Sequence, residues 1–267
     1  MEVIVVTASG FEQKLVDAPA SISVITREDI SKKPYTTLLD AVRDLEGVDI
    51  GETRDKTGQG SISMRGMGSD YTLVLVDGKR QNNHGNIYPN NFVGNQFGHI
   101  PPLVAIDRIE VIRGPSSTLY GADALGGVIN VITKKVNGRW EGSVSHSRSK
   151  QTDDAFGEDI TTDFNIMGPL IPGILAMSVR GSVYNRMAST PEYAPVNYPN
   201  GEVRNRPLGF GAGGRTVDNT NEVLGGRLSW TPLDNQTLWF DIESSRQDYD
   251  NTPVINADGE RQYPLGT

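Results

Sequence analysis

The second half of the chain contains segments in which apolar and polar side chains alternate with a period of two residues. From 175 to 183 the odd positions are apolar or glycine, while Ser178, Arg180 and Ser182 lie between them. Successive side chains of a strand point to opposite faces of a sheet, so this pattern predicts a strand with one apolar and one polar face. Other segments repeat the pattern, the first of them more weakly: 140–149, 160–166, 222–230 and 238–243. The second half is therefore expected to form an antiparallel β-meander of about five strands.

The connections between these strands distinguish two explanations of the alternation. A soluble β-sandwich would show the same pattern. However, the connections at 168–173 and 231–235 are short, whereas the connection at 187–220 is long and rich in Pro, Asn and Gly. Short turns on one side and long loops on the other are typical of outer-membrane barrels, and Trp230 lies where an aromatic girdle would lie. A mean hydropathy of −0.38 is compatible with a barrel, because barrel strands are half polar.

The first half, before Lys134-Lys135, predicts a compact α+β domain. Two Thr-x-x-Asp sequences, which begin at Thr26 and Thr37, predict capping boxes at the starts of two short helices. Gly47 supplies a left-handed stop after the second helix, and Asp77-Gly78 favours a tight turn. Strands are predicted at five places: 21–25, 61–65, 71–76, 106–112 and 128–133.

Composition argues against several classes of function. Asp and Glu outnumber Lys and Arg by 33 to 25 in the 267 residues, and this net charge of −8 argues against a nucleic-acid partner. The chain has no cysteine and three scattered histidines, so no thiolate or histidine metal site is expected. Gly121, Gly126 and Gly127 are interpreted as turn glycines, because no phosphate-binding lysine follows them. We therefore predict no catalytic residue, metal or cofactor, and no apolar run is long enough for a membrane-spanning helix.

Several motifs of the first half carry a resemblance to a known family. Residues Glu2-Val3-Ile4-Val5-Val6-Thr7-Ala8 resemble the TonB box of the TonB-dependent outer-membrane receptors. Residues 17–26 are similar to the start of the plug domain of these receptors, and further motifs match in the same order: 62–68, 73–80, 109–115 and 119–135. Within the family, the chain is most similar to the branch that takes up ferric catecholate siderophores and that some colicins also use.

This resemblance implies three parts of the chain. A TonB-box segment would occupy 1–10, an α+β plug domain 11–135, and the first strands of a transmembrane β-barrel 136–267. Barrels of this type have about 22 strands, so the chain is expected to be a fragment with about five of them. The protein would lie in the outer membrane of a Gram-negative bacterium, with the plug inside the barrel and lipid around it.

The implied function is active uptake of a ferric siderophore, without catalysis, with TonB as the periplasmic partner. An extended apolar segment near the chain start is suited to pair with the edge of another protein's sheet, although such a segment is also typical of an ordinary edge strand. Haem and cobalamin remain alternative cargoes. A passive, non-transporting barrel is disfavoured because it would need no plug, and a sensor because it would need a further domain before the TonB box.

The resemblance also implies candidate site residues. Two loops, 51–60 and 81–99, would face the extracellular mouth of the barrel. An anionic ferric catecholate would bind cations, aromatic rings and hydrogen-bond donors there, which predicts these ligand-binding residues: Arg54, Lys56, Arg80, His84, Tyr88, Phe92 and Phe97. Arg80 is the leading candidate because it follows the well-matched Asp77-Gly78-Lys79. Arg65 and Arg113 are given a docking role, with acidic residues of later barrel strands as their partners.

Overall fold

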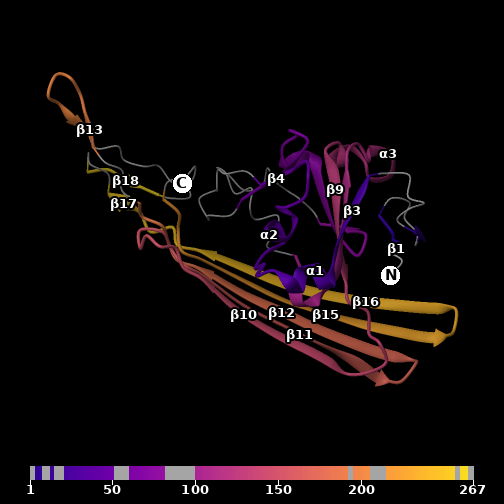
Figure 1. The fold of residues 1–267 in the computed structure, drawn as a ribbon. Coiled ribbons are helices and arrows are strands. Elements are labelled where there is room, and N and C mark those ends of the chain that lie inside the picture. The colour runs from indigo at the N-terminus through magenta and orange to yellow at the C-terminus, as the bar shows by residue number, and fades with distance from the viewer. Residues whose placement is uncertain are drawn as a thin grey trace.

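The computed structural model describes residues 4–7, 13–14, 21–50, 60–81, 100–191, 195–204, 215–255 and 259–263. These residues form two sheets of five strands, which we call the N-terminal and the C-terminal sheet, together with four two-stranded sheets. Figure 1 shows the N-terminal sheet and its helices lying against one face of the C-terminal sheet. In the part of the chain described, no helix is long and apolar enough to cross a membrane.

The N-terminal sheet has the strand order β3-β8-β9-β6-β7. All neighbouring strands are antiparallel except β6 and β9, which are parallel. The bounds are β3 (Ile22–Thr26), β6 (Thr72–Val76), β7 (Lys79–Arg80), β8 (Ile106–Arg113) and β9 (Gly127–Thr133). The prediction at 61–65 corresponds to β5 (Ile62–Met64), which pairs with β4 (Val48–Ile50) outside this sheet. Each predicted strand of the first half therefore corresponds to an observed strand within two residues at either end.

Both predicted capping boxes are present. Thr26 caps α1 (Arg27–Lys32) and Thr37 caps α2 (Leu38–Val42), each with the aspartate three residues later. Gly47 has a φ of 75°, which is the predicted left-handed conformation. The remaining helical segments are short: α3 (Ser117–Tyr120), η2 (Ser69–Tyr71), η4 (Leu103–Ala105) and η5 (Ala122–Ala124).

The two faces of the N-terminal sheet are covered differently. Ile109 and Val111 of β8 lie in the larger hydrophobic core, together with buried residues of α2. Alternation along the strand places Glu110 on the opposite face, where it is directly opposite Asn130 of β9. The segment that contains β1 (Ile4–Val5) supplies contacts on that second face, and β1 pairs with β2 (Gln13–Lys14).

The C-terminal sheet has the order β10-β11-β12-β15-β16, with every pair antiparallel. Its strands are β10 (Glu141–Ser149), β11 (Asp159–Ile171), β12 (Leu175–Arg186), β15 (Asn219–Leu233) and β16 (Gln236–Tyr249). The inner face, toward the N-terminal sheet, carries polar residues such as the buried Arg180, whereas Phe240 on the outer face is 66% exposed. The predicted meander and its alternation are confirmed.

Both short connections are shorter than predicted. In the turn expected at 231–235, the strand β15 continues to Leu233. The segment 168–173 is expected to be a turn, but β11 continues to Ile171 and the turn follows it. Pro169 is tolerated in the strand because β10 pairs with β11 no further than Met167, and a register shift lies between Pro169 and Ile171.

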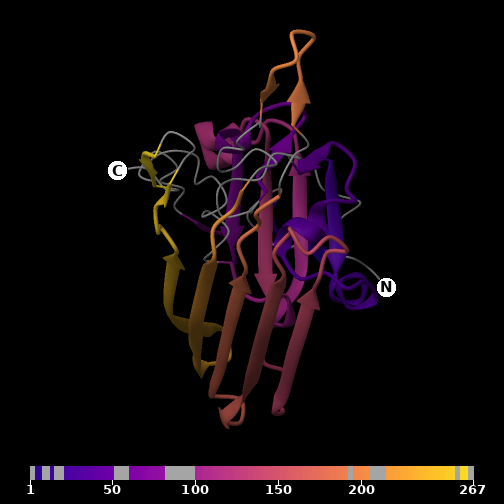
Figure 2. The same cartoon turned by 90° about the vertical axis from the view of Figure 1, so that its left-hand side faces the viewer.

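The long connections form small hairpins at the other end of the C-terminal sheet. The 187–218 connection contains β13 (Val196–Asn197) and β14 (Val203–Arg204), and beyond β16 the chain forms β17 (Val254–Ile255) and β18 (Arg261–Gln262). Figure 2 shows the β13–β14 hairpin projecting beyond the sheet at the end opposite the short turns.

Gly127 is the first residue of β9 and not a turn residue, in contrast to the prediction. A Cβ atom at this position would lie 2.2 Å from Met64 Sδ and 2.5 Å from the backbone oxygen of Ile112. Gly121, with a φ of 82° after α3, does occupy a turn. Close packing therefore explains why a glycine is needed at position 127, and the positive φ angle explains why one is favoured at position 121.

We expect Gly127→Ala to destabilise the N-terminal domain by about 1–3 kcal/mol, because the backbone of β8 must move to admit the methyl group. The measurement is the urea midpoint of a polypeptide of residues 1–135, followed by circular dichroism. Gly68→Ala is the matched control, because a Cβ atom there meets no atom within 4 Å and its φ of −60° suits alanine. Equal midpoints for both variants would contradict the close-packing explanation.

Candidate functional site

Residues 4–7, which we call the N-terminal segment, are docked on the face of the N-terminal sheet that carries Glu110. The side chains of Val5 and Thr7 are fully buried. Three donors of this segment converge on Oε2 of Glu110: the backbone N–H of Val6 at 2.9 Å, the N–H of Thr7 at 2.8 Å and Oγ1 of Thr7 at 2.5 Å. Of the predicted TonB box, Ile4 to Thr7 are thus placed, while Glu2, Val3 and Ala8 lie outside the described residues.

Glu110 is a fully buried carboxylate on β8. Its Oε1 accepts a hydrogen bond from Nε of Arg108 at 2.9 Å. The two oxygens therefore have four donors, one of which belongs to a guanidinium. Hydrogen bonds to an ionised group are about twice as strong as neutral ones, and a buried carboxylate that loses its donors is costly. Glu110 consequently holds the N-terminal segment strongly.

Two further side chains complete the hydrogen bonds of Thr7. Asn130 Nδ2 donates to Thr7 Oγ1 at 3.0 Å, and the hydroxyl of Tyr120 donates to the Thr7 carbonyl oxygen at 2.6 Å. Burial and the negative charge of Glu110 raise the pKa of Tyr120, so the phenol keeps its proton and remains a donor at neutral pH. Every polar group of Thr7 thus has a partner within the N-terminal domain.

A charged cluster joins the two sheets. Nη2 of Arg227, on the inner face of β15, lies 2.6 Å from Oδ2 of Asp77, and Nε of Arg227 lies 2.5 Å from Oδ1 of Asp241 on β16. Lys79 forms a second ion pair with Asp241. Thr133 Oγ1 lies 3.1 Å from Nη1 of Arg227. Positive and negative groups alternate through this cluster, which fixes the Asp77-Gly78 turn against the C-terminal sheet.

The two arginines predicted to dock the plug have neighbours within the N-terminal domain. Nη1 of Arg113 donates to the backbone oxygen of Glu46 at 3.0 Å, and Nη2 to Ser21 Oγ at 3.3 Å. The guanidinium of Arg65 lies against Gly114. A Cβ atom added to Gly114 would lie 2.9 Å from Nη1 of Arg65. Their pairing with acidic residues of later strands stays a prediction.

Arg80 is the one predicted ligand-binding residue within the described part of the chain. Its guanidinium forms an ion pair with Asp123 and donates to the backbone oxygen of Tyr120. Arg80 therefore has partners inside the N-terminal domain, and Asp123 offsets its charge. The other predicted ligand-binding residues lie outside the described residues: Arg54, Lys56, His84, Tyr88, Phe92 and Phe97.

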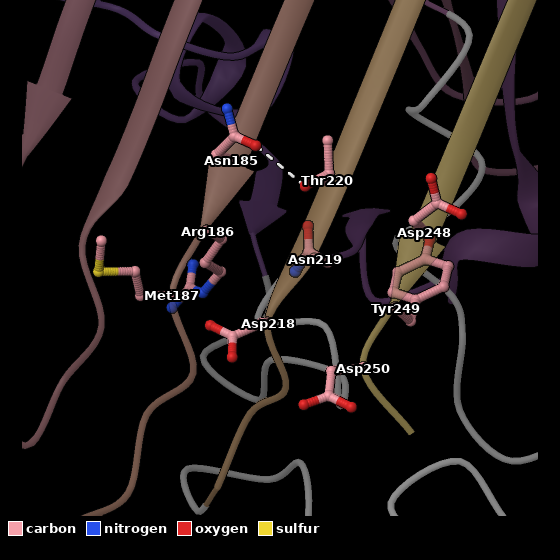
Figure 3. A pocket seen from close by; sticks show the side chains of 9 residues that line it. All are labelled: Asn185, Arg186, Met187, Asp218, Asn219, Thr220, Asp248, Tyr249 and Asp250. Carbon is pink, nitrogen blue, oxygen red and sulfur yellow. Dashed lines mark hydrogen bonds between the residues drawn. The ribbon is translucent and has the colours of Figure 1, made fainter. Parts of the chain in front are cut away.

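A cavity of about 430 Å³ lies at the loop end of β12, β15 and β16, as Figure 3 shows. Two of its carboxylates close loops, because Asp218 accepts from the backbone N–H of Ala188 at 2.6 Å and Asp250 from that of Thr252 at 2.8 Å. The charged residues that line it are one arginine and three aspartates: Arg186, Asp218, Asp248 and Asp250. This cavity has the wrong sign of charge for an anionic ligand. Among the described residues, no group of His, Cys, Asp and Glu side chains could hold a metal ion.

Comparison with known proteins identifies the family. Residues 14–128 match the family model of the TonB-dependent receptor plug domain. An iron-regulated outer membrane virulence protein of Vibrio cholerae is 47% identical over 185 residues, which are 69% of this chain and 28% of that protein. This chain belongs to the TonB-dependent receptors.

Solved structures of such receptors share its fold. The crystal structure of the siderophore receptor PirA from Acinetobacter baumannii matches 85% of this chain and 32% of its own, with 35% identity and a TM-score of 0.69. A ferric enterobactin receptor mutant from Pseudomonas aeruginosa, in complex with enterobactin, matches 85% of this chain and 33% of its own, with 29% identity and a TM-score of 0.68. The chain thus spans about a third of the length of the proteins it matches.

The family membership orients this receptor in the outer membrane. The C-terminal sheet is the first part of the barrel wall, and the N-terminal domain is the plug against its inner face. Short turns of such barrels lie on the periplasmic side and long loops on the extracellular side. Figure 1 shows β1 and the N-terminus toward the end of the wall that carries the short turns. The docked N-terminal segment is therefore placed toward the periplasm.

We expect Thr7→Val to weaken docking of the N-terminal segment by about 1–3 kcal/mol, because Asn130 and Glu110 each lose a buried partner while the shape is kept. Residues 1–267 contain no cysteine, so Val6→Cys introduces the one thiol of this part of the complete receptor, and labelling of the receptor without Val6→Cys gives the background to subtract. The rate of maleimide labelling at this site should rise in the Thr7→Val background. Thr237→Val, which changes a threonine of β16, is the control, and labelling that is equally fast in both backgrounds would contradict the role of Thr7.

Proposed function

We propose that this chain is the plug and the first part of the barrel wall of a receptor that actively takes up a ferric siderophore of the catecholate type, without catalysing a reaction. The observation that carries the proposal is the docked extended segment at residues 4–7, in which Val5 and Thr7 are buried. It is held by one local hydrogen-bond network and not by the main hydrophobic core. Such a segment can leave its domain without unfolding it.

The energy for uptake is proposed to come from TonB in the periplasm. A released extended segment offers backbone N–H and C=O groups on both edges, and adding a strand to an exposed sheet edge is a common mode of peptide recognition. Residues Ile4–Thr7 are β-branched throughout, and the first three of them are apolar, which favours the extended conformation. Pulling on this segment would act directly on Glu110 and Tyr120, and through them on the plug sheet.

The catecholate assignment rests on the relatives and on charge. The matched P. aeruginosa protein is described as a ferric enterobactin receptor. Two segments that the sequence predicts to be loops, 51–60 and 81–99, carry cations and aromatic residues suited to an anionic aromatic ligand. We propose these loops as the site where the cargo binds, and the receptor as a surface that some colicins also use.

Replacing Val5 by proline tests the energy-coupling role. Proline removes a backbone donor and prevents regular strand pairing, so siderophore uptake by the complete receptor should stop while siderophore affinity is kept. Val5→Thr retains a β-branched residue and should support normal uptake. Normal uptake by the Val5→Pro receptor would show that strand pairing by this segment is not required.

Neutralising the two loop cations tests the cargo. The Arg54→Gln/Lys56→Gln receptor should bind an anionic ferric catecholate more weakly by about 1–3 kcal/mol, because charged partners are lost, and should bind a neutral ferric complex as before. Lys32→Gln is the control, since Lys32 lies on exposed α1 and pairs with Glu28. Titration calorimetry measures each affinity. A receptor that binds haem or cobalamin and none of the catecholates would contradict the catecholate assignment.

A further inference from the structure

The β6–β7 hairpin contacts both the barrel wall and the residues that hold the N-terminal segment. Its loop is the two residues Asp77 and Gly78, with φ angles of 49° and 76°. Positive φ at both central residues is typical of a type I′ turn, the tightest connection between antiparallel strands. Because the loop is so short, its residues cannot move independently of one another. A force on one side of the hairpin therefore reaches the other side.

On the wall side, the hairpin is held through Asp77 and Lys79. The carboxylate of Asp77 accepts from Nη2 of Arg227 at 2.6 Å and from the N–H and the hydroxyl of Thr133 at 2.8 and 2.7 Å. The side chains of Asp77 and Arg227 are 15% and 14% exposed, so salt screens this pair much less than a surface pair. Lys79 adds the ion pair with Asp241.

On the plug side, the hairpin leads to Thr7 by two routes. The N–H of Gly78 donates to Oδ1 of Asn130 at 3.1 Å, and Nδ2 of the same amide donates to Thr7 Oγ1 at 3.0 Å. Arg80 donates to the backbone oxygen of Tyr120, whose hydroxyl donates to the Thr7 carbonyl oxygen at 2.6 Å. Asn130 is buried and its amide is fixed at both ends, so a shift of Gly78 changes the orientation of the group that binds Thr7.

We infer that Arg227 of the barrel wall is a positioning residue for the N-terminal segment, and that it acts through the hairpin at 77–80. This inference rests on the proposed function, in which that segment is the site of energy coupling. Loss of the Arg227–Asp77 pair leaves the Asp77 carboxylate held by β9 alone, through Thr133. The turn can then shift relative to the wall, and Gly78 shifts against the Asn130 amide that it orients. Coupling of this kind is reciprocal, so release of the segment also weakens the contact between plug and wall.

The test measures segment docking directly, without transport and without TonB. The complete receptor carries Val6→Cys, and the rate of maleimide labelling is compared between Arg227→Gln and Arg180→Gln. Arg180 is a suitable control because it is also a buried inner-face arginine, and it pairs with Glu243 of the wall at 2.9 Å. Arg227→Gln should raise the labelling rate about fivefold or more, whereas Arg180→Gln should leave it unchanged. Equal labelling rates for the two variants overturn the inference.

A double-mutant cycle tests the route. In the Asn130→Ala background, one of the two routes is already cut, so Arg227→Gln should raise the labelling rate by a smaller factor than in the parent receptor. Equal factors in both backgrounds overturn the route through Asn130. If Arg227→Gln does not fold, Asp77→Asn removes the same ion pair from the plug side, and Asn-Gly retains the type I′ turn.

The outcome is independent of the proposed function. Normal uptake by the Val5→Pro receptor refutes energy coupling at the segment, while the labelling rates still show whether the wall positions it. Conversely, unchanged labelling in both Arg227→Gln and Asp77→Asn refutes the inference, while loss of uptake in Val5→Pro still supports the function.

Discussion

Docking of the N-terminal segment on the plug depends on one buried carboxylate. Glu110 lies in the middle of β8, where an ionised group without partners would be strongly unfavourable. It is tolerated because Arg108 and three donors of residues 6–7 surround it. The N-terminal segment thus supplies three of the four donors of this carboxylate, although it lies more than a hundred residues away in sequence. Hydrogen bonds around Glu110 and the burial of Val5 hold the segment, whereas the larger hydrophobic core on the other face includes neither of them.

Sequence patterns predicted the elements of this fold because those elements depend on local rules. The capping boxes at Thr26 and Thr37 and the Asp77-Gly78 turn involve residues within three positions of each other. The barrel strands follow a period of two that any half-exposed sheet imposes. The end of β11 escaped prediction because the tolerance for Pro169 depends on how far the neighbouring β10 extends, which no local pattern contains.

The site was predicted in part, because its contacts join distant residues. The N-terminal segment was identified by its motif, but its partners Glu110, Asn130 and Tyr120 were not. A signal was present, since Glu110 interrupts the apolar run at 109–112 and Asn130 the apolar run at 128–132. A buried polar residue needs a partner, and nothing local shows which one. The resemblance assigns Arg80 to ligand binding, whereas in the structure Arg80 contacts Asp123 and Tyr120. These contacts depend on how β7 packs beside α3 and η5, which the sequence around Arg80 does not show.

The polar character of the surface beneath the N-terminal segment has a consequence for repeated cycles of release and return. When residues 4–7 leave, they expose a carboxylate, an amide and a phenol, which water can solvate. The apolar side chains of the same face, such as Leu75 and Val128, remain packed in their own small cluster with Ile22 and Tyr120. Under the proposed function, the opened plug would therefore present groups that water can solvate where Thr7 was bound, which limits the apolar surface open to aggregation and to lipid.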